Sequence, residues 1–427
     1  MSYLKFIMLL AVAFVSSAVA QETESVLSLP SKQYMLSGVD NPMFVQTFTK
    51  YEFLDGDIVR FGGSTTYAKN GLLAKRANIT NPKSGETIDV KLYDGKTFEV
   101  KESYTSTICA GEPKVGGKPI VVQMFGDSFT KGLYFKDAFL AKGYVPNVKL
   151  VGTRIVNGYE GHFHEGRGGW TLPRYFSNIP TDDRFFNPFF QPTSDQRYWG
   201  SVAFWRNATK LNRGEKEGLD SGTRYDCCDF DSSRYGDDGF LKAPKKGDVM
   251  YDNGYKEWSG KKWVSIAEPK EWRFNYGKYL AMWSVECPDF LIVMLGLNDY
   301  RDEPLPLQFG EWNKMAEELL ASFKSVNPKG KLLLSTPCTS CGTLDNDRGF
   351  FTTRQNTTMW YVRENIIKHF DGRESEGIYV VDASITIDNE NGYNKKDGIQ
   401  TGNPHPYPNY PQLGVPLAAC VQYLRNK

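Results

Sequence analysis

The sequence predicts an α/β protein with a parallel sheet, preceded by a small all-β sandwich domain. Two observations support this prediction. Residues 26–109 hold short segments in which apolar and polar residues alternate, separated by turn residues. After residue 119, apolar strand-like segments alternate with helical patterns. A stretch at 114–119 with two glycines and a proline at its end separates the two regions and reads as a linker.

A short apolar segment opens the chain. Lys5 precedes an uninterrupted apolar run at 6–15, and small residues follow at 16–20. This order is typical of a secretory signal peptide, and the run is shorter than the ~20 residues that span a bilayer. We therefore predict a signal peptide at 1–20, a mature chain that begins at Gln21, and a secreted or periplasmic protein.

The composition gives no sign of a nucleic-acid or membrane partner. The chain holds 51 basic and 50 acidic residues, and no later segment is apolar enough to cross a bilayer. Its seven cysteines are an odd number, so at least one thiol is unpaired in a monomer. Cys338 and Cys341 have neither a second such pair nor a histidine nearby, and we expect no metal and no cofactor.

Residues 21–112 are predicted to form the sandwich domain. Its strand-like segments lie at 44–48, 57–61, 88–92 and 97–100. Residues 113–427 are predicted to form the α/β domain. Its strand-like segments lie at 120–125, 148–152, 290–295, 331–335 and 378–381, and its helical segments at 312–323, 358–370 and 417–424. This alternation implies a parallel sheet with helices on both faces.

A long aromatic-rich stretch at about 178–271 interrupts the alternation. It holds no convincing strand–helix unit, and a β-hairpin is predicted within it at 249–258. So long an excursion between core elements is usually functional or a subdomain, so we predict an insertion that acts as a lid or wall. Aromatic residues make up 14% of the chain, which fits either a ligand-facing surface or a large core.

Three segments that can carry chemistry follow predicted strands. They read GDSFT at 126–130, GRGGWT at 166–171 and GLND at 296–299. Because the carboxyl ends of parallel strands meet at one edge of a sheet, we expect these segments to converge. A serine there needs a base and oxyanion donors, which glycine N–H groups and an asparagine amide can supply. Taken singly, each segment is also ordinary loop or helix-cap chemistry.

Together the three segments resemble the first conserved blocks of the GDSL/SGNH hydrolases. The similarity runs from about residue 119 to the end, apart from the insertion. It implies a flavodoxin-like three-layer parallel sheet and serine acyl chemistry, with Ser128 as the nucleophile. It also implies an oxyanion hole made of the N–H groups of Ser128 and Gly169 and the side chain of Asn298. Small β-sandwich domains precede the hydrolase domain in bacterial secreted carbohydrate esterases of this type.

The last block of the family, Asp-x-x-His, is altered here. Asp397 is followed three residues later by Gln400, and the next histidine is His405, ahead of the final helical segment. We predict His405 as the base and Asp397 as the residue that orients it, with Asp382 as the alternative orienting residue. His164, beside the second block, is the alternative base. A turn histidine in a proline-rich loop is the structural alternative for His405.

These observations predict a secreted serine esterase that acts on a polysaccharide or oligosaccharide ester. Acetyl is the expected acyl group, since sugar O-acetylation is common. Trp170 and His164 are predicted to contact the substrate, Trp170 by stacking on a sugar ring. Two alternatives remain: a lipid, thioester or peptidoglycan esterase of the same type, and a polysaccharide-binding protein that has lost catalysis, with Gln400 marking the loss.

Overall fold

The computed structural model describes most of the chain. The described residues are 25–50, 56–64, 76–177, 187–199, 236, 240–252, 254–338, 353–389, 391–396, 398–400, 404–425 and 427. The predicted signal peptide at 1–20, Gln21 and Asp397 lie outside these residues.

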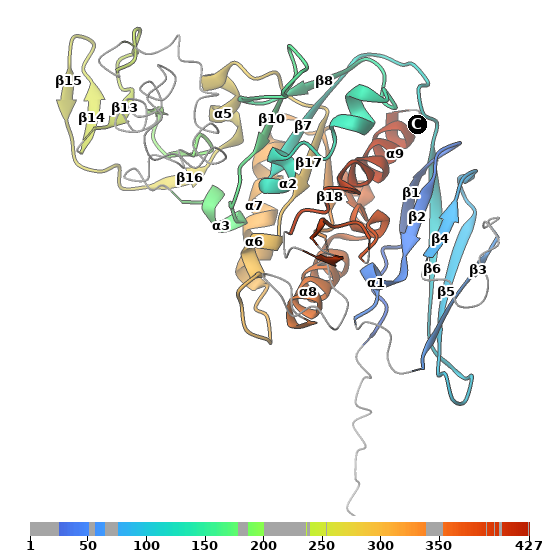
Figure 1. Cartoon of the computed structure of the whole chain (residues 1–427). Coiled ribbons are helices and arrows are strands. Elements are labelled where there is room, and N and C mark those ends of the chain that lie inside the picture. Colours follow the sequence, from blue (N-terminus) through green and yellow to red (C-terminus); the bar gives the residue numbers. More distant parts are fainter. Residues whose placement is uncertain are drawn as a thin grey trace, which may run out of the picture.

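Five parallel strands form the centre of the molecule (Figure 1). Their order is β8–β7–β17–β18–β19, and each neighbouring pair runs parallel. The bounds are β7 (Ile120–Gly126), β8 (Val148–Val151), β17 (Phe290–Met294), β18 (Lys331–Ser335) and β19 (Ile378–Val381). All five residues of β17 are buried, because the middle of the sheet is covered on both faces. All five predicted strands and the α/β class are confirmed.

Four longer helices accompany the sheet, and their bounds are α5 (Tyr276–Trp283), α7 (Gly310–Val326), α8 (Thr353–Phe370) and α9 (Gly414–Arg425). The three predicted helices fall within α7, α8 and α9 and are confirmed. One face of α7 is buried through Trp312, Ala316, Leu319, Leu320 and Phe323, a helical spacing. Among the described residues, none of the helices combines the length and the apolar character that a membrane span requires.

Short turns of helix join these elements: α1 (Val45–Phe48), α2 (Ser128–Lys131), η1 (Asp137–Ala141), α3 (Leu172–Tyr175), α6 (Leu297–Tyr300), η4 (Glu374–Glu376), η5 (Ser384–Thr386) and η6 (Tyr410–Leu413). Two of them, α2 and α6, begin just beyond the carboxyl ends of β7 and β17. They therefore carry the first and third sequence blocks to the same edge of the sheet.

The second sequence block does not directly follow β8, as the sequence had suggested. Two further strands, β9 (Arg154–Ile155) and β10 (Phe163–Gly166), come between them. β10 runs parallel to β7, with Glu165 opposite Phe125 and Gly166 opposite Gly126. The GRGGWT segment therefore leaves the sheet directly beside the end of β7.

The N-terminal region is built from two β layers, coloured blue to cyan in Figure 1. A four-stranded sheet has the order β1–β6–β5–β3, and β2 pairs with β4. The bounds are β1 (Lys32–Leu36), β2 (Asn41–Phe44), β3 (Ile58–Gly63), β4 (Arg76–Ile79), β5 (Thr87–Tyr93) and β6 (Val100–Gly111). Met43 and Ile79 of the small layer share one core with Val59, Val90 and Ile108 of the large one. The predicted β character is confirmed, and the boundary at 112/113 remains a prediction.

Two predicted strand segments differ in detail. The segment 44–48 is a strand only up to Phe44, after which the turn α1 follows. Of the segment 97–100 only Val100 is in a strand: residues 95–97 form a turn, in which the Asp94 carboxylate accepts the backbone N–H groups of Lys96 (2.8 Å) and Thr97 (2.9 Å). Side-chain acceptors of this kind draw the backbone out of the strand conformation.

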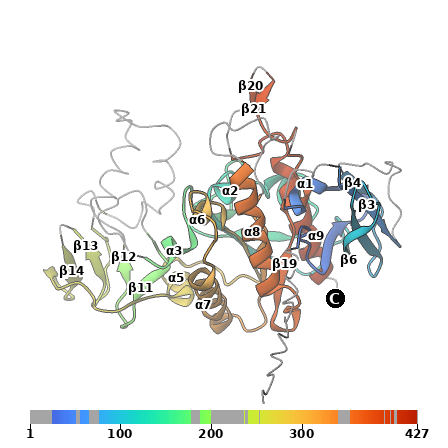
Figure 2. The same cartoon turned by 90° about the horizontal axis from the view of Figure 1, so that it is seen from below.

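The other face of the N-terminal sheet packs on α9, as Figures 1 and 2 show together. Tyr34, Leu36 and Cys109 of this sheet belong to the same core as the parallel sheet. A side chain at Gly111 would meet the carbonyl oxygen of Ala419 at 2.5 Å, so the strand lies very close to the helix. α9 is buried almost all round because β strands cover its outer side.

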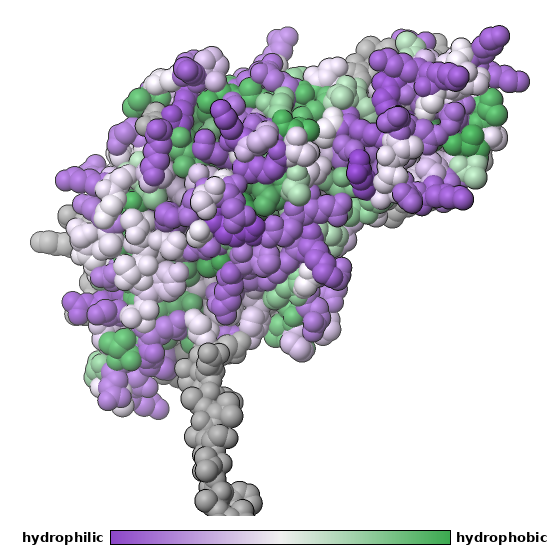
Figure 3. All heavy atoms as spheres, turned by 180° about the vertical axis from the view of Figure 1, so that it is seen from behind, coloured by the Kyte–Doolittle hydropathy of each residue, from purple (hydrophilic) through white to green (hydrophobic). Residues whose placement is uncertain are grey.

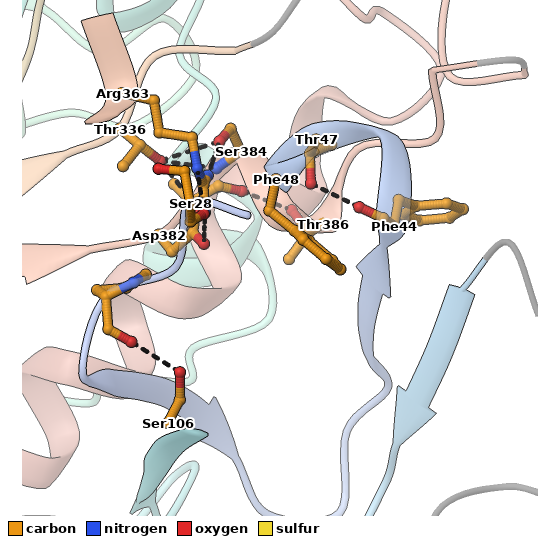
Figure 4. A network of polar contacts seen from close by, with 12 residues as sticks. Ser28, Phe44, Thr47, Phe48, Ser106, Thr336, Arg363, Asp382, Ser384 and Thr386 are labelled. Carbon is orange, nitrogen blue, oxygen red and sulfur yellow. Dashed lines mark hydrogen bonds and ion pairs between the residues drawn. The ribbon is translucent and has the colours of Figure 1, made fainter. Parts of the chain in front are cut away.

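A buried polar network ties the N-terminal segment to the α/β domain (Figure 4). The Arg363 side chain of α8 is fully buried and pairs through both terminal nitrogens with the Asp382 carboxylate, just after β19. Its Nε donates to the carbonyl oxygen of Ser28 (2.9 Å). Ser384 Oγ accepts from Arg363 Nη1 (3.0 Å), and Thr336 Oγ1 donates to Asp382 Oδ1 (2.9 Å).

The insertion forms a small β structure at the end of the molecule opposite the N-terminal sheet (Figure 1). Its strands are β11 (Phe190–Pro192), β12 (Tyr198–Trp199), β13 (Val249–Tyr251), β14 (Tyr255–Trp258), β15 (Trp263–Ser265) and β16 (Trp272–Phe274). The predicted hairpin is confirmed as β13 and β14.

Several described aromatic residues of the insertion belong to the same hydrophobic core as the parallel sheet. Phe189, Tyr198, Trp199 and Tyr255 are buried, and the Phe189 ring stacks on Tyr279 of α5 at 4.1 Å. Much of the predicted lid falls at 200–235, outside the described residues. The face of the molecule in Figure 3 carries mainly hydrophilic side chains, with apolar ones in scattered groups.

We predict that Arg363→Met lowers the free energy of unfolding by about 3–5 kcal/mol, because Asp382 then stays buried without its counter-charge. Urea denaturation measures this change. Lys314→Met is the control, since it removes an ion pair with Glu311 whose side chains are 74% and 80% exposed, and little change is expected. A loss at Arg363 no larger than the control's would contradict the structural importance of the network.

Candidate active site

Ser128 is the first residue of α2 and is half-buried at the carboxyl end of β7. The Asp127 carboxylate caps this turn by accepting the N–H of Phe129 (2.9 Å). A side chain at Gly126 would meet the carbonyl oxygen of Met294 at 2.4 Å and Thr130 Oγ1 at 2.5 Å. Glycine therefore allows α2 to begin tightly against β17, which places Ser128 at the edge of the sheet.

The GRGGWT segment lies beside this serine. The N–H of Arg167 donates to the carbonyl oxygen of Gly126 (2.8 Å), and the N–H of Trp170 donates to that of Arg167 (3.1 Å). Between them Gly169 adopts a φ of +76° and is exposed, with open space where a side chain would point. The conformation is one that glycine adopts readily, and it leaves the Gly169 backbone accessible to a ligand.

Asn298 of α6 joins the first and second blocks. Its Nδ2 donates to the carbonyl oxygen of Trp170 (3.2 Å) and to Asp127 Oδ2 (3.3 Å). The next residue, Asp299, fixes the loop further. Its Oδ1 accepts from the N–H of Leu172 (2.7 Å) and from Trp312 Nε1 (2.9 Å), and its Oδ2 accepts from the N–H of Gly296 (3.1 Å). The structure thus brings the three predicted segments together.

His405 lies beside the serine-bearing turn. Its ring centroid is 4.9 Å from that of Phe129, the residue after Ser128. Tyr410 fastens the two segments, since its hydroxyl donates to the carbonyl oxygens of Phe129 (2.6 Å) and Ser128 (3.2 Å). Burial, with a smaller effect of the Lys131 charge, lowers the pKa of His405 to about 4. The ring is therefore neutral at ordinary pH and able to accept a proton.

The other histidines are placed less well for catalysis. His164 is 4% exposed, and its Nδ1 accepts the N–H of Gly166 (2.9 Å). Burial lowers the pKa of His164 to about 3, with the charge of Arg154 adding to the effect. Its predicted contact with substrate is wrong, because the ring is enclosed within the protein. His162 Nδ1 accepts from the N–H of Leu150, while His369 pairs with Glu317 on the surface.

Trp170 is also buried, which corrects the prediction that it stacks on a sugar. Its side chain is 2% exposed and packs edge-on against Tyr175, with ring centroids 4.7 Å apart. The Arg167 guanidinium lies 4.9 Å from the Trp170 ring centroid. The ring serves to hold the second block in place, and no face is open to a ligand.

The residue that orients the base is Asp397 in the prediction, and it lies outside the described residues. Short strands β20 (Lys395–Lys396) and β21 (Ile399–Gln400) pair antiparallel on either side of it. The alternative, Asp382, is 2% exposed, and Arg363, Thr336 and Ser384 occupy its carboxylate. These contacts assign Asp382 to the network with Arg363 and not to the orientation of a histidine.

Two buried carboxyl groups were not recognised from the sequence as part of the site. Burial raises the pKa of Asp127 to about 7, with a smaller contribution from the charge of Asp299. Burial likewise raises the pKa of Asp299 to about 6. Both are members of the blocks themselves, Asp127 of GDSFT and Asp299 of GLND, and this is the sequence signal that could have found them. Within the described residues, no group of histidine, cysteine and acidic side chains could hold a metal ion.

No family model and no curated protein matches the sequence. Among solved structures, a carbohydrate esterase family 3 from Talaromyces cellulolyticus matches with a TM-score of 0.32 and 12% identity, over 72% of this chain and 98% of that one. The salicylyl-acyltransferase SsfX3 from a tetracycline biosynthetic pathway matches with a TM-score of 0.28 and 10% identity, over 86% and 73%. None of these values reaches 0.5, so the likenesses decide neither the fold nor the activity of this chain.

We predict that Tyr410→Phe destabilises the protein by about 1 kcal/mol, because it removes a buried hydroxyl that fastens η6 to α2. Thermal and urea unfolding measure the effect. Tyr407→Phe is the matched control: the same hydroxyl is lost from a side chain that is 49% exposed, and stability should hardly change. Equal effects of the two substitutions would show that the Tyr410 hydrogen bonds contribute little.

Proposed function

We propose that the protein is a serine esterase in which Ser128 is the nucleophile and His405 the base. The observation that carries this proposal is the meeting of three sequence blocks at one edge of the sheet, with the neutral His405 ring packed beside them. Nucleophile, base and oxyanion donors are the parts that acyl transfer requires, and here they come from four separate segments of the chain.

The reaction follows from these positions. Ser128 Oγ attacks the ester carbonyl while His405 takes the hydroxyl proton. The N–H groups of Ser128 and Gly169, with Asn298 Nδ2, stabilise the negative oxygen of the tetrahedral intermediate. His405 then returns the proton to the departing alcohol, and water releases the acyl group through the same base. Asp397 is our proposed orienting residue for the ring.

The order of the strands supports assignment to the GDSL/SGNH type. When the short strand β10, which also runs parallel to β7, is left aside, the other five parallel strands are arranged 2-1-3-4-5 in sequence order. This is the flavodoxin-like order, and its sites lie at the carboxyl ends of the strands. Ser128 follows the strand numbered 1 and Asn298 the strand numbered 3, next to each other in the sheet. We propose a three-layer arrangement of this kind, with the N-terminal β layers added at α9.

For the substrate we propose an O-acetyl group on a polysaccharide or oligosaccharide outside the cytoplasm. The support is the signal-peptide pattern at 1–20 and the similarity of the motifs to those of secreted carbohydrate esterases. The second candidate, a polysaccharide-binding protein without catalysis, is favoured by Gln400 at the usual position of the base. Hydrolysis by the purified protein separates the two.

We predict that Ser128→Ala abolishes hydrolysis of a chromogenic acetate ester and labelling by a serine-directed phosphonate, because it deletes the one attacking hydroxyl. Ser325→Ala, which removes an exposed hydroxyl on α7, should leave both unchanged. Absence of hydrolysis by the wild-type protein would favour the binding protein. Residual activity above a few per cent in a folded Ser128→Ala protein would contradict the role of Ser128.

His405→Ala should reduce turnover as severely as Ser128→Ala, since residues that act as one unit fail together. His164→Asn, which keeps an acceptor for the N–H of Gly166, should cost far less per folded molecule. Because the pKa of His405 is lowered to about 4, the base stays neutral down to that pH, and the acid limb of wild-type kcat/KM should lie near pH 4. Near-normal turnover of His405→Ala would show that another group is the base.

A further inference from the structure

We infer that Asp127 is a positioning residue that controls the oxyanion hole: the esterase works with Asp127 neutral and slows when Asp127 ionises. This inference rests on the proposed function. It concerns a carboxyl group that neither attacks the substrate nor accepts its proton, and that stands one residue before the nucleophile.

The side chain of Asn298 has few hydrogen atoms to donate. An amide nitrogen carries two hydrogens. In this structure Nδ2 of Asn298 has two acceptors within hydrogen-bonding distance, the Trp170 carbonyl oxygen at 3.2 Å and Asp127 Oδ2 at 3.3 Å. When both hydrogens are directed to these acceptors, neither points to the oxygen of a substrate. Asn298 Nδ2 can donate to the oxyanion of the transition state only if one of these two hydrogen bonds is released.

The two acceptors of Asn298 differ, because only one of them can be protonated. The Trp170 carbonyl belongs to the backbone of the second block and cannot lose its acceptor strength. Asp127 becomes a weaker acceptor when it is protonated, because hydrogen bonds to charged groups are roughly twice as strong as those to neutral groups. Protonation also removes a negative charge from the neighbourhood of the developing oxyanion, which like charge would destabilise.

The surroundings of Asp127 favour the neutral form of its carboxyl group. Asp127 is 1% exposed, and its carboxyl group also accepts hydrogen bonds from the backbone N–H groups of Phe129 and of Asp127 itself. The titratable groups that act on it or feel its charge are Asp299 of α6, Tyr134 after α2, Tyr175 of α3, Cys338 after β18 and Tyr410 of η6. Not one of these groups is a cation at neutral pH.

Lys131, one turn further along α2, acts on His164 and His405. Burial and the charge of Asp299 accordingly raise the pKa of Asp127 to about 7. Asp127 is therefore neutral below about pH 7, while His405 is neutral above about pH 4. Both groups are therefore neutral between about pH 4 and about pH 7. The rate should fall below it as His405 gains a proton, and above it as Asp127 loses one.

The test is the pH dependence of kcat and kcat/KM from pH 3 to 9, on a chromogenic acetate ester. For the wild-type protein, the plot of rate against pH should be bell-shaped, and its alkaline limb should lie near pH 7. Asp127→Asn, which replaces the acid by a neutral group of the same shape, should lose that limb. At pH 9 it should be faster than wild type by roughly tenfold or more, since loss of one oxyanion donor costs ~10²–10³.

Two further variants make the result specific. Asn298→Ala should lower the plateau, and its alkaline limb should shrink because no amide remains for Asp127 to engage. Asp299→Asn should keep the limb but move it to lower pH, because the neighbouring negative charge that raises the pKa of Asp127 is gone. If Asp127→Asn does not fold, the carboxyl resonance of Asp127 in the wild-type protein, followed by ¹³C NMR, should titrate with the kinetic limb.

Persistence of the alkaline limb in Asp127→Asn, or a carboxyl midpoint below pH 5, overturns the inference. So does a wild-type rate that stays level to pH 9. In these cases the proposed function still holds if Ser128→Ala abolishes the activity. If the wild-type protein hydrolyses no ester at any pH, the proposed function fails and the inference fails with it, so the two failures can be told apart.

Discussion

The buried pair of Arg363 and Asp382 is the constraint on which the rest of the structure depends. A guanidinium without exposed surface must be matched in charge and in hydrogen bonds, and Asp382, Ser384 and the carbonyl of Ser28 do this together. Because these partners come from the end of β19 and from the first described residues, the pair fixes the N-terminal layers against the parallel sheet. The pair therefore ties the segment around Ser28 to the end of β19.

The site depends on the sheet in a second way, through close backbone approach. Gly126 lets α2 start against β17, and Gly166 lets β10 pass the same turn, where a side chain would lie 2.1 Å from the N–H nitrogen of Lys131. Tyr410 then fastens the C-terminal segment that carries His405 onto α2. Ser128 and His405 are 277 residues apart in sequence, yet the His405 ring lies against Phe129, the residue after Ser128.

The sequence predicted the sheet well, because continuous apolar runs such as 290–295 are characteristic of strands covered on both faces. It also predicted where Ser128 and Asn298 lie, since strand ends meet at one edge. It failed where a residue's environment is set by distant segments. Trp170 was interpreted as a sugar platform but is enclosed by Tyr175, and Asp382 belongs to Arg363. An arginine within a helix looks like a surface residue until its partner is known.

The contact between Arg363 and Ser28 joins residues that are 335 positions apart. The core between the N-terminal layers also includes Ile385. The other face of the four-stranded sheet packs on α9, near the very end of the chain. The first part to be synthesised therefore cannot complete its packing until almost the whole chain has been made. Such a high contact order predicts slow folding after synthesis.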